Sequence, residues 1–177
     1  MTDATPSEVD LDDARAFVQD AYRRRSSDGE QAAQHPQAVA RLLSEDGQPP
    51  RLVLAGLLHD LLEDTEVGPE ELRARFGPEV TGLVQALTQD PSISDYYERK
   101  AALRRQVLDA GRDAATVALA DKSAKLAAES SRPKERRLGH YQATLEGIEK
   151  RYGRSRLSER LHQELQRFPA EKDASRN

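Results

Sequence analysis

The segment over residues 52–65, LVLAGLLHDLLEDT, constrains the fold most, because it sets ionisable side chains into an otherwise apolar run. It has helical length and contains no proline, so a single helix is expected there. On such a helix His59 and Glu63 stand four residues apart, as do Asp60 and Asp64, and each pair projects from one side. Four polar groups are therefore expected to converge on one surface.

The neighbouring residues indicate that this segment lies inside the protein. Residues 52–58 are apolar nearly all round, which is typical of a helix buried in the centre of a domain. Ionisable groups are costly there unless they are paired or bound to a metal ion. A divalent cation is the simplest explanation for His59 and Asp60. The alternative is a helix whose C-terminal half emerges into solvent.

The composition narrows the chemistry of such a site. The 177 residues include no cysteine, so a disulfide framework and a thiolate site are excluded, and metal ligands must be histidine and carboxylate. The length predicts one folded domain over residues 10–168, with a flexible N-terminus over 1–9 and a flexible tail over 169–177. No apolar run approaches about eighteen residues and no signal peptide is recognisable, so a cytoplasmic protein without a membrane partner is expected.

Apolar residues recur at helical spacing along most of the chain, and no long strand-like alternation appears, so the expected fold class is all-α. Asp10 is expected to cap the first helix, and Pro36 suits the first turn of the next, which puts His35 at a helix start. Asp121 is the lone acid in the apolar window 114–128. Further helices are expected from about 10–25, 31–43, 69–76, 78–87, 95–110 and 114–128, with two more separated near Gly153.

The net charge of −4 hides an asymmetry between the two halves of the chain. Residues 1–94 carry 8 Lys/Arg and 18 Asp/Glu, whereas residues 95–177 carry 19 and 13. A basic second half could attract phosphates or nucleic acid, but its arginines alternate with glutamates as on a solvated helix face. We therefore expect most of this charge at the surface and no nucleic-acid partner.

Together, His35, the His59-Asp60 pair and Asp121 resemble the HD-domain metal-dependent phosphohydrolases, in which a His, a His-Asp pair and a distant Asp bind the metal. The order of longer segments is similar to the RelA/SpoT-type alarmone hydrolase domain and its small single-domain relatives, over about residues 17–129. The segments are DGEQAAQHPQAVARLL, LAGLLHDLLEDTEVGPEELRARFGPEVTGLVQALT, YYERK and VALADKSAKL.

The resemblance implies a compact multi-helix HD-domain bundle with a metal site between central helices. Glu63 and Asp64 would position or activate the attacking water, and Arg99 and Lys100 of the YYERK segment become candidate phosphate contacts. Four residues would hold one Mn²⁺ ion: His35, His59, Asp60 and Asp121. Read without the resemblance, His35 could be a simple helix-start residue.

Several positions depart from the family's pattern. Four residues after the ligand aspartate the family has an asparagine that faces the nucleotide sugar, and this chain has Lys125. The basic residues expected in the first loop are replaced around Ser26 and Ser27, the family's Pro-Tyr-Ile before the first histidine is replaced over residues 31–33, and a lysine is replaced by Ala118. Phosphohydrolase chemistry with an altered substrate specificity is therefore expected.

The leading prediction is a Mn²⁺-dependent phosphohydrolase of a small phosphorylated nucleotide, resembling guanosine-3′,5′-bis(diphosphate) 3′-pyrophosphohydrolase. The 2′-phosphate of NADPH is an alternative substrate, and a catalytically silent nucleotide-binding regulator or a helical interaction module are alternative functions. Asp121 could merely pair with Lys122 or Lys125. Lys125 is expected as a solvated charge outside the site, and His140 and His162 as packing or surface residues.

Overall fold

The computed structural model of this chain describes residues 8–25 and 29–169, and every regular element within those ranges is an α-helix. The all-α prediction is thereby confirmed. The ends predicted to be flexible were residues 1–9 and 169–177, and of these residues 1–7 and 170–177 lie outside the described residues, as do residues 26–28 of the first loop. Residues 8 and 9 belong to the first helix. No helix in the described part of the chain is long and apolar enough to cross a membrane.

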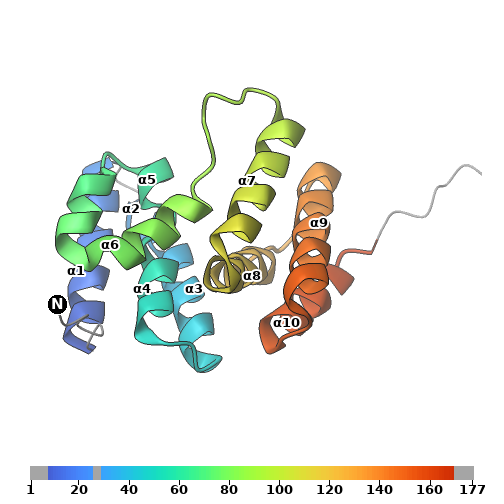
Figure 1. Cartoon of the computed structure of the whole chain (residues 1–177), viewed down its shortest axis with the longest axis horizontal. Helices are drawn as coiled ribbons and strands as arrows, with labels where there is room; N and C mark the ends of the chain where they lie inside the picture. The colour runs from blue at the N-terminus through green and yellow to red at the C-terminus, as the bar shows by residue number, and fades with distance from the viewer. Residues whose placement is uncertain (1–7, 26–28, 170–177) are drawn as a thin grey trace, which may run out of the picture.

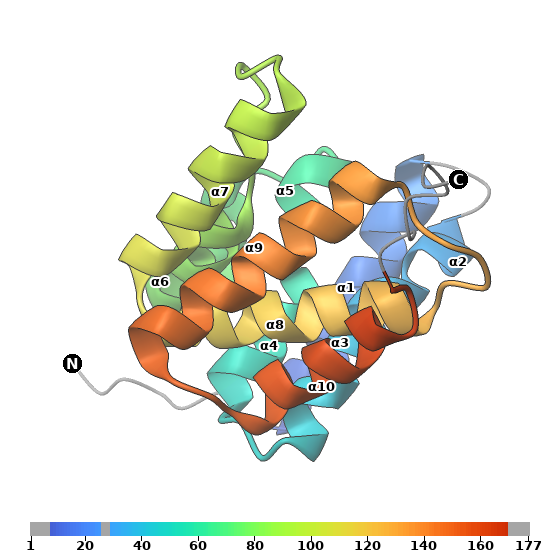
Figure 2. The same ribbon diagram turned by 90° about the vertical axis from the view of Figure 1, so that its right-hand side faces the viewer.

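The helices of the described residues are α1 (Glu8–Arg25), α2 (Gly29–Ala32), α3 (Gln34–Glu45), α4 (Pro50–Leu58), α5 (Leu61–Asp64), α6 (Pro69–Leu87), α7 (Tyr96–Ala110), α8 (Arg112–Ala127), α9 (Glu135–Tyr152) and α10 (Arg156–Gln166). They pack around α8, which runs through the middle of the molecule (Figures 1 and 2). Helix α8 contacts the N-terminal helices α3, α4 and α6 as well as α7, α9 and α10. The N-terminal part of α7 and the loop before it project beyond the other helices (Figure 2).

The core is built mainly on α4 and α8. Every residue of α4 from Leu52 to Leu58 is buried, as the apolar segment predicts. Helix α8 contributes small side chains, and Ala114, Ala118 and Ala120 are fully buried. Small residues let neighbouring helices approach closely, so polar side chains from α3 and α8 can reach the end of α4.

The single helix expected over residues 52–65 is wrong. Helix α4 ends at Leu58, α5 begins at Leu61, and His59 and Asp60 form the turn between them. The ring Nδ1 of His59 donates to the carbonyl oxygen of Gly56 at 2.7 Å, so a side chain is the hydrogen-bond donor to a carbonyl in the last turn of α4. The four ionisable side chains of this segment therefore do not follow one face of a single helix.

Other helix boundaries follow from local chemistry. Gly77 adopts φ 83° and divides α6 into the two helical parts that were expected on either side of it. Asp95 caps α7, and its side chain accepts from the Glu98 amide at 2.8 Å. The expected cap at Asp10 is wrong, because α1 already begins at Glu8.

Gly56 permits the close approach of α3 and α4. A Cβ atom there would overlap Leu43 Cδ1 and lie 3.2 Å from Val39 Cγ1. We expect Gly56→Ala to lower the free energy of unfolding by about 1–3 kcal/mol, the usual cost of overpacking. The matched control is Gly82→Ala in exposed helix, where nothing lies within 4 Å of the new Cβ. That change is expected to stabilise slightly. Equal effects in urea unfolding would contradict the close contact.

Candidate metal centre

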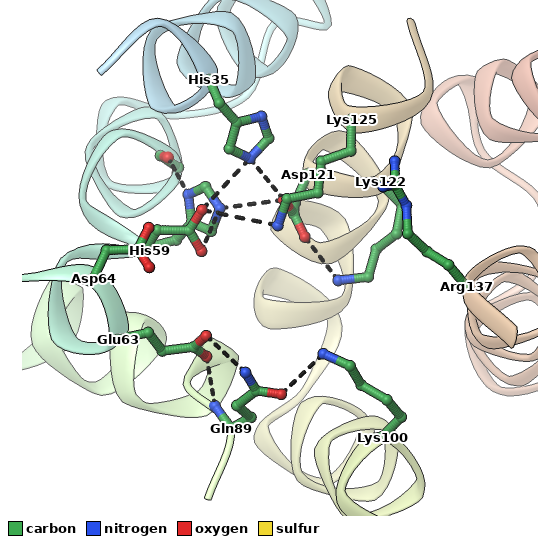
Figure 3. A network of polar contacts seen from close by, with 12 residues as sticks. His35, His59, Glu63, Asp64, Gln89, Lys100, Asp121, Lys122, Lys125 and Arg137 are labelled. Atoms are coloured by element: carbon green, nitrogen blue, oxygen red, sulfur yellow. Dashed lines mark hydrogen bonds and ion pairs between the residues drawn. The ribbon is translucent and has the colours of Figure 1, made fainter. Parts of the chain in front are cut away.

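Two histidines and two aspartates from distant parts of the chain meet in one cluster, and Figure 3 labels three of them, His35, His59 and Asp121. His35 comes from the first turn of α3, His59 and Asp60 from the turn after α4, and Asp121 from α8. One possible ligand atom from each lies within 4.8 Å of the others. The structure thus brings together all four residues that the sequence suggested as metal ligands.

His59 is oriented as a metal-binding histidine would be. Its ring is buried, and because Nδ1 donates to Gly56 O, the lone pair of the neutral ring is on Nε2. That Nε2 atom lies 3.1 Å from Asp60 Oδ1 and 3.2 Å from Asp121 Oδ1. A lone pair facing two carboxylates is favourable only when a proton or a cation lies between them, and a backbone carbonyl on the other nitrogen is the usual outer support of a histidine ligand.

His35 is the fourth member of the His/Asp cluster and contacts both aspartates. Its Nε2 atom lies 2.9 Å from Asp121 Oδ1 and 3.6 Å from Asp60 Oδ2. The two imidazole rings are edge to face, with centroids 5.3 Å apart. Both imidazoles therefore converge on the same carboxylate oxygen of Asp121.

Two lysines of α8 also reach this group. Lys125 Nζ lies 2.9 Å from Asp121 Oδ1 and 3.8 Å from Asp60 Oδ2, and Lys122 Nζ lies 2.7 Å from Asp121 Oδ2. The expectation that Lys125 is a solvated charge outside the site is wrong. Residues four apart on a helix share a face, so the Asp121/Lys125 spacing was the signal that could have placed it.

These neighbours keep both carboxylates ionised. Burial alone would raise the pKa of Asp121, but the charges of Lys122 and Lys125 hold it well below its usual range. Asp60 behaves likewise, with a lowered pKa caused mainly by His59 and Lys125 against the opposing effect of burial. Burial lowers the pKa of His59, yet Asp60 and Asp121 together raise it to about 10. The group therefore strongly favours a cation.

A cavity of about 180 Å³ lies beside the cluster, and positively charged and aromatic side chains line much of it. Asp60, His59 and Glu63 also face it. The four lysines and arginines of this lining all belong to residues 95–177, whose positive charge was expected mostly at the solvated surface. For these four side chains that expectation is wrong. The cationic and aromatic residues of the lining are Lys100, Lys122, Lys125, Arg137, Tyr96, Tyr141 and His140.

His140, expected to be a packing or surface residue, is a buried part of this lining. Burial, together with the charges of Lys122, Lys100 and Arg104, lowers its pKa to about 3. The ring is therefore neutral near pH 7, and its Nδ1 accepts from Arg104 at 3.0 Å, which leaves the proton on Nε2.

Glu63 and Asp64 point to different neighbours. Glu63 faces the 180 Å³ cavity, and its two oxygens accept from the backbone and side-chain nitrogens of Gln89 at 2.7 and 3.1 Å. Asp64 turns towards α1, where Tyr22 Oη donates to it at 3.2 Å and Arg25 lies 3.9 Å away. Asp64 is absent from the described lining of that cavity, so the expected convergence of all four polar groups is wrong.

Arg99 and Lys100 also separate. Lys100 reaches the cavity, where its Nζ donates to Gln89 Oε1 at 2.9 Å. The guanidinium of Arg99 donates to the carbonyl oxygens of Ile93 and Ser94 at 2.6 and 3.0 Å and supports the loop before α7. A phosphate contact by either residue stays a prediction.

An all-helical domain that gathers imidazoles and carboxylates beside a cation-lined cavity is a metal-binding domain suited to anionic ligands. The chain belongs to the HD-domain family, whose model matches residues 14–146. The sequence-based family assignment is thereby confirmed, and membership implies binding of a divalent metal ion.

Curated relatives match over part of their length. The chain is 37% identical over 106 residues to guanosine-3′,5′-bis(diphosphate) 3′-pyrophosphohydrolase MESH1 of Danio rerio, a match that covers 56% of each protein. It is 46% identical over 66 residues to a GTP pyrophosphokinase of Streptomyces coelicolor, which covers 37% of this chain and 8% of that protein. The chain thus spans little more than half of one relative and a small part of the other.

Two solved structures share the fold. A metazoan ortholog of SpoT, described as hydrolysing ppGpp, superposes with a TM-score of 0.75 at 24% identity and covers 93% of this chain and 98% of its own. The protein lmo0812 from Listeria monocytogenes has a TM-score of 0.65 at 28% identity, with coverages of 75% and 91%. Both likenesses extend beyond the central helices to most of the domain.

Removal of divalent metal should lower the melting temperature, and Mn²⁺ should restore it, because a ligand bound only by the native state stabilises it by mass action. At a free metal concentration about a hundred times Kd the gain is about 2.7 kcal/mol. His59→Ala and Asp121→Asn should abolish this response, whereas His162→Ala, which changes a histidine paired with Glu149 outside the cluster, should keep it. Identical melting with chelator and with Mn²⁺ would refute the metal centre.

Proposed function

We propose that this protein is a Mn²⁺-dependent phosphohydrolase of a small phosphorylated nucleotide, with removal of the 3′-pyrophosphate of guanosine 3′,5′-bis(diphosphate) as the leading reaction. One observation carries the proposal: the His/Asp cluster and the cation-lined cavity are continuous, because His59, Asp60 and Asp121 belong to both. The names of the relatives that match over part of the chain support the choice of substrate.

The donor set suits a first-row divalent ion. Imidazole nitrogen and carboxylate oxygen together favour ions such as Mn²⁺, and the orientation of His59 fits a cation between Nε2 and the two carboxylates. When bound, such an ion supplies Lewis acidity toward a phosphoryl oxygen and makes a bound water more acidic. The residues that would hold it are His35, His59, Asp60 and Asp121.

The cavity lining would bind and orient the phosphoryl groups. Ammonium and guanidinium groups form strong charge-assisted hydrogen bonds with phosphate oxygens, and a partly enclosed site increases their strength. Lys122 and Lys125 stand next to the cluster, whereas Lys100 and Arg137 line the cavity from α7 and α9. This distribution fits a substrate with more than one phosphoryl group.

A second, larger groove of about 790 Å³ adjoins the cluster through His35. Its lining mixes apolar residues such as Leu11, Val53 and Ala124 with polar and charged ones that include Gln31, Gln34, Arg15, Arg41 and Glu45. The apolar residues suit the face of an uncharged ring system, and the amide side chains suit its polar edge. A nucleotide combines such a ring system with phosphates, so the two openings beside one cluster match its two chemical halves.

Glu63 is the proposed proton acceptor. It lines the same cavity as Asp60 and Asp121, whereas Asp64 is engaged by Tyr22 and is assigned a supporting role. Water oxygen would form a bond to the phosphorus next to the ribose 3′ oxygen, one water proton would pass to the Glu63 carboxylate, and the bond from that phosphorus to the 3′ oxygen would break. The 3′ oxygen would take up the proton that Glu63 accepted, so the products are the 3′-hydroxyl nucleotide and pyrophosphate.

A different phosphorylated nucleotide is the second candidate, and Lys125 favours it. The Lys125 ammonium lies against Asp121 and lines the cavity where the family pattern has an uncharged asparagine. A cation in this place favours a substrate with an additional anionic group nearby, and the 2′-phosphate of NADPH has this chemistry.

The cytoplasmic location also stays a prediction.

The test is a screen of the full chain with Mn²⁺ against guanosine 3′,5′-bis(diphosphate) and NADPH, in which pyrophosphate and phosphate are measured separately. Pyrophosphate release from the first compound is expected. Phosphate release from NADPH alone would replace the leading substrate. No turnover of either would favour the silent nucleotide-binding regulator.

The matched variant for this screen is Glu63→Gln, which keeps size and hydrogen bonding but removes the basic oxygen. Its kcat should fall by about a hundredfold or more, as expected for loss of a general base, while Mn²⁺ affinity stays close to wild type. Unchanged turnover in this variant would refute the role of Glu63 without refuting the reaction.

Lys125→Met should raise KM about tenfold, the loss expected for one hydrogen bond between charged groups, if the ammonium contacts the substrate. Lys150→Met on the exposed surface of α9 is the control and should leave KM unchanged. Steady-state kinetics at saturating Mn²⁺ would separate KM from kcat. Equal KM values in both variants and wild type would remove Lys125 from the substrate site.

A further inference from the structure

We propose that Gln89 is a positioning residue, which holds the Glu63 carboxylate and the Lys100 ammonium in fixed places on the wall of the cavity. The inference rests on the proposed function, because it gives Glu63 and Lys100 their roles toward the substrate. Gln89 was not singled out by its sequence context, and it lies in the connection between α6 and α7.

Gln89 uses its backbone N–H and both polar atoms of its side chain in hydrogen bonds (Figure 3). Its backbone N–H donates to Glu63 Oε1 at 2.7 Å and its side-chain Nε2 donates to Glu63 Oε2 at 3.1 Å. Its Oε1 atom accepts from Lys100 Nζ at 2.9 Å and from Arg99 Nε at 3.3 Å. One amide thus connects the proposed proton acceptor with a cation of the cavity.

The Glu63 side chain requires contacts that hold it in one orientation. Its side chain is exposed at the cavity, and a freely rotating glutamate has several rotamers of similar energy. Two donors from one residue, one on each carboxylate oxygen, select a single orientation. Catalytic groups that are held in place before the substrate arrives lose less entropy in the transition state.

The segment that carries Gln89 is itself fastened on both sides. On the α6 side, Gln106 Nε2 donates to the carbonyl oxygens of Gln85, Ala86 and Thr88 at 3.0, 3.0 and 2.8 Å. On the α7 side, the Arg99 guanidinium donates to the carbonyl oxygens of Ile93 and Ser94. Side chains of α7 therefore fix the backbone before and after Gln89, which makes its position rigid enough to orient Glu63.

Only an amide satisfies both neighbours of this side chain. It donates to a carboxylate with its nitrogen and accepts from an ammonium with its oxygen. A carboxylate at position 89 would still accept from Lys100 but would repel Glu63. A thioether of similar length would serve neither. These two replacements therefore separate the Glu63 contact from the Lys100 contact.

The experiment compares Gln89→Glu and Gln89→Met in the full chain with Mn²⁺ and guanosine 3′,5′-bis(diphosphate). Gln89→Glu should lower kcat about tenfold with KM near wild type, because a displaced base is costly in the transition state. Gln89→Met should lower kcat and also raise KM, since Lys100 loses its anchor. Gln85→Met on the exposed face of α6 is the matched control and should change neither.

A double-mutant cycle tests whether Gln89 acts through Glu63. In the Glu63→Gln background, Gln89→Glu should cause no further loss of kcat, because the carboxylate that it orients is gone. The same double variant exchanges the amide and the carboxylate, so its melting temperature should stay near wild type although activity is not restored. A further loss of kcat equal to that in the wild-type background would overturn the inference.

The outcomes distinguish this inference from the proposed function. If Glu63→Gln is inactive but both Gln89 variants keep wild-type kcat and KM, the inference fails and the proposed function stands. If wild type turns over neither substrate, the proposed function fails. Direct binding of inorganic pyrophosphate then tests the Lys100 contact, because Gln89→Met should weaken this binding and Gln89→Glu should not. Equal pyrophosphate affinity in both variants would overturn that contact as well.

Discussion

The buried carboxylate of Asp121 is the group on which the centre of this structure depends. An ionised carboxylate is costly in a protein interior unless partners surround it, and removal of a single partner leaves an uncompensated charge. Its partners here are two imidazoles and two ammonium groups, from His35, His59, Lys122 and Lys125. Because His35 belongs to α3 and His59 follows α4, satisfying this one carboxylate joins three helices that are distant in sequence.

The break after α4 directs the ionisable side chains of the HDLLED segment to different neighbours. A continuous helix would have placed His59 above Glu63 on one face. Instead, the turn at His59 and Asp60 directs them to Asp121, while Glu63 faces Gln89 and Asp64 faces Tyr22. A cation-binding group and a carboxylate at the cavity wall thus arise from six consecutive residues without competing for one position.

Most of the helices could be predicted from apolar spacing and the meeting of four distant residues from the family resemblance, but most of the polar contacts around those residues could not. Apolar spacing reports which residues of a helix are buried, and it indicated the burial of residues 52–58 and the helix α8, although it missed the break after Leu58. It does not report that Nδ1 of His59 donates to the carbonyl oxygen of Gly56. The spacing of four between Asp121 and Lys125 allowed their contact, but it did not show that the lysine also lines the cavity. Gln89 was missed for a related reason, because its partners come from a turn and a helix that only the tertiary fold brings together.

The balance of charge connects the cation site to the cavity. Asp60 and Asp121 contribute two negative charges, and Lys122 and Lys125 contribute two positive charges within 4 Å of them. A divalent cation at this group would therefore leave an excess of positive charge next to a cavity that Lys100 and Arg137 also line. A phosphorylated substrate would be the natural counter-charge. Because coupling between two ligands is reciprocal, the cation and the substrate would each strengthen binding of the other. Lys122 and Lys125, which balance the charges of the aspartates, would be the residues that couple cation binding to substrate binding.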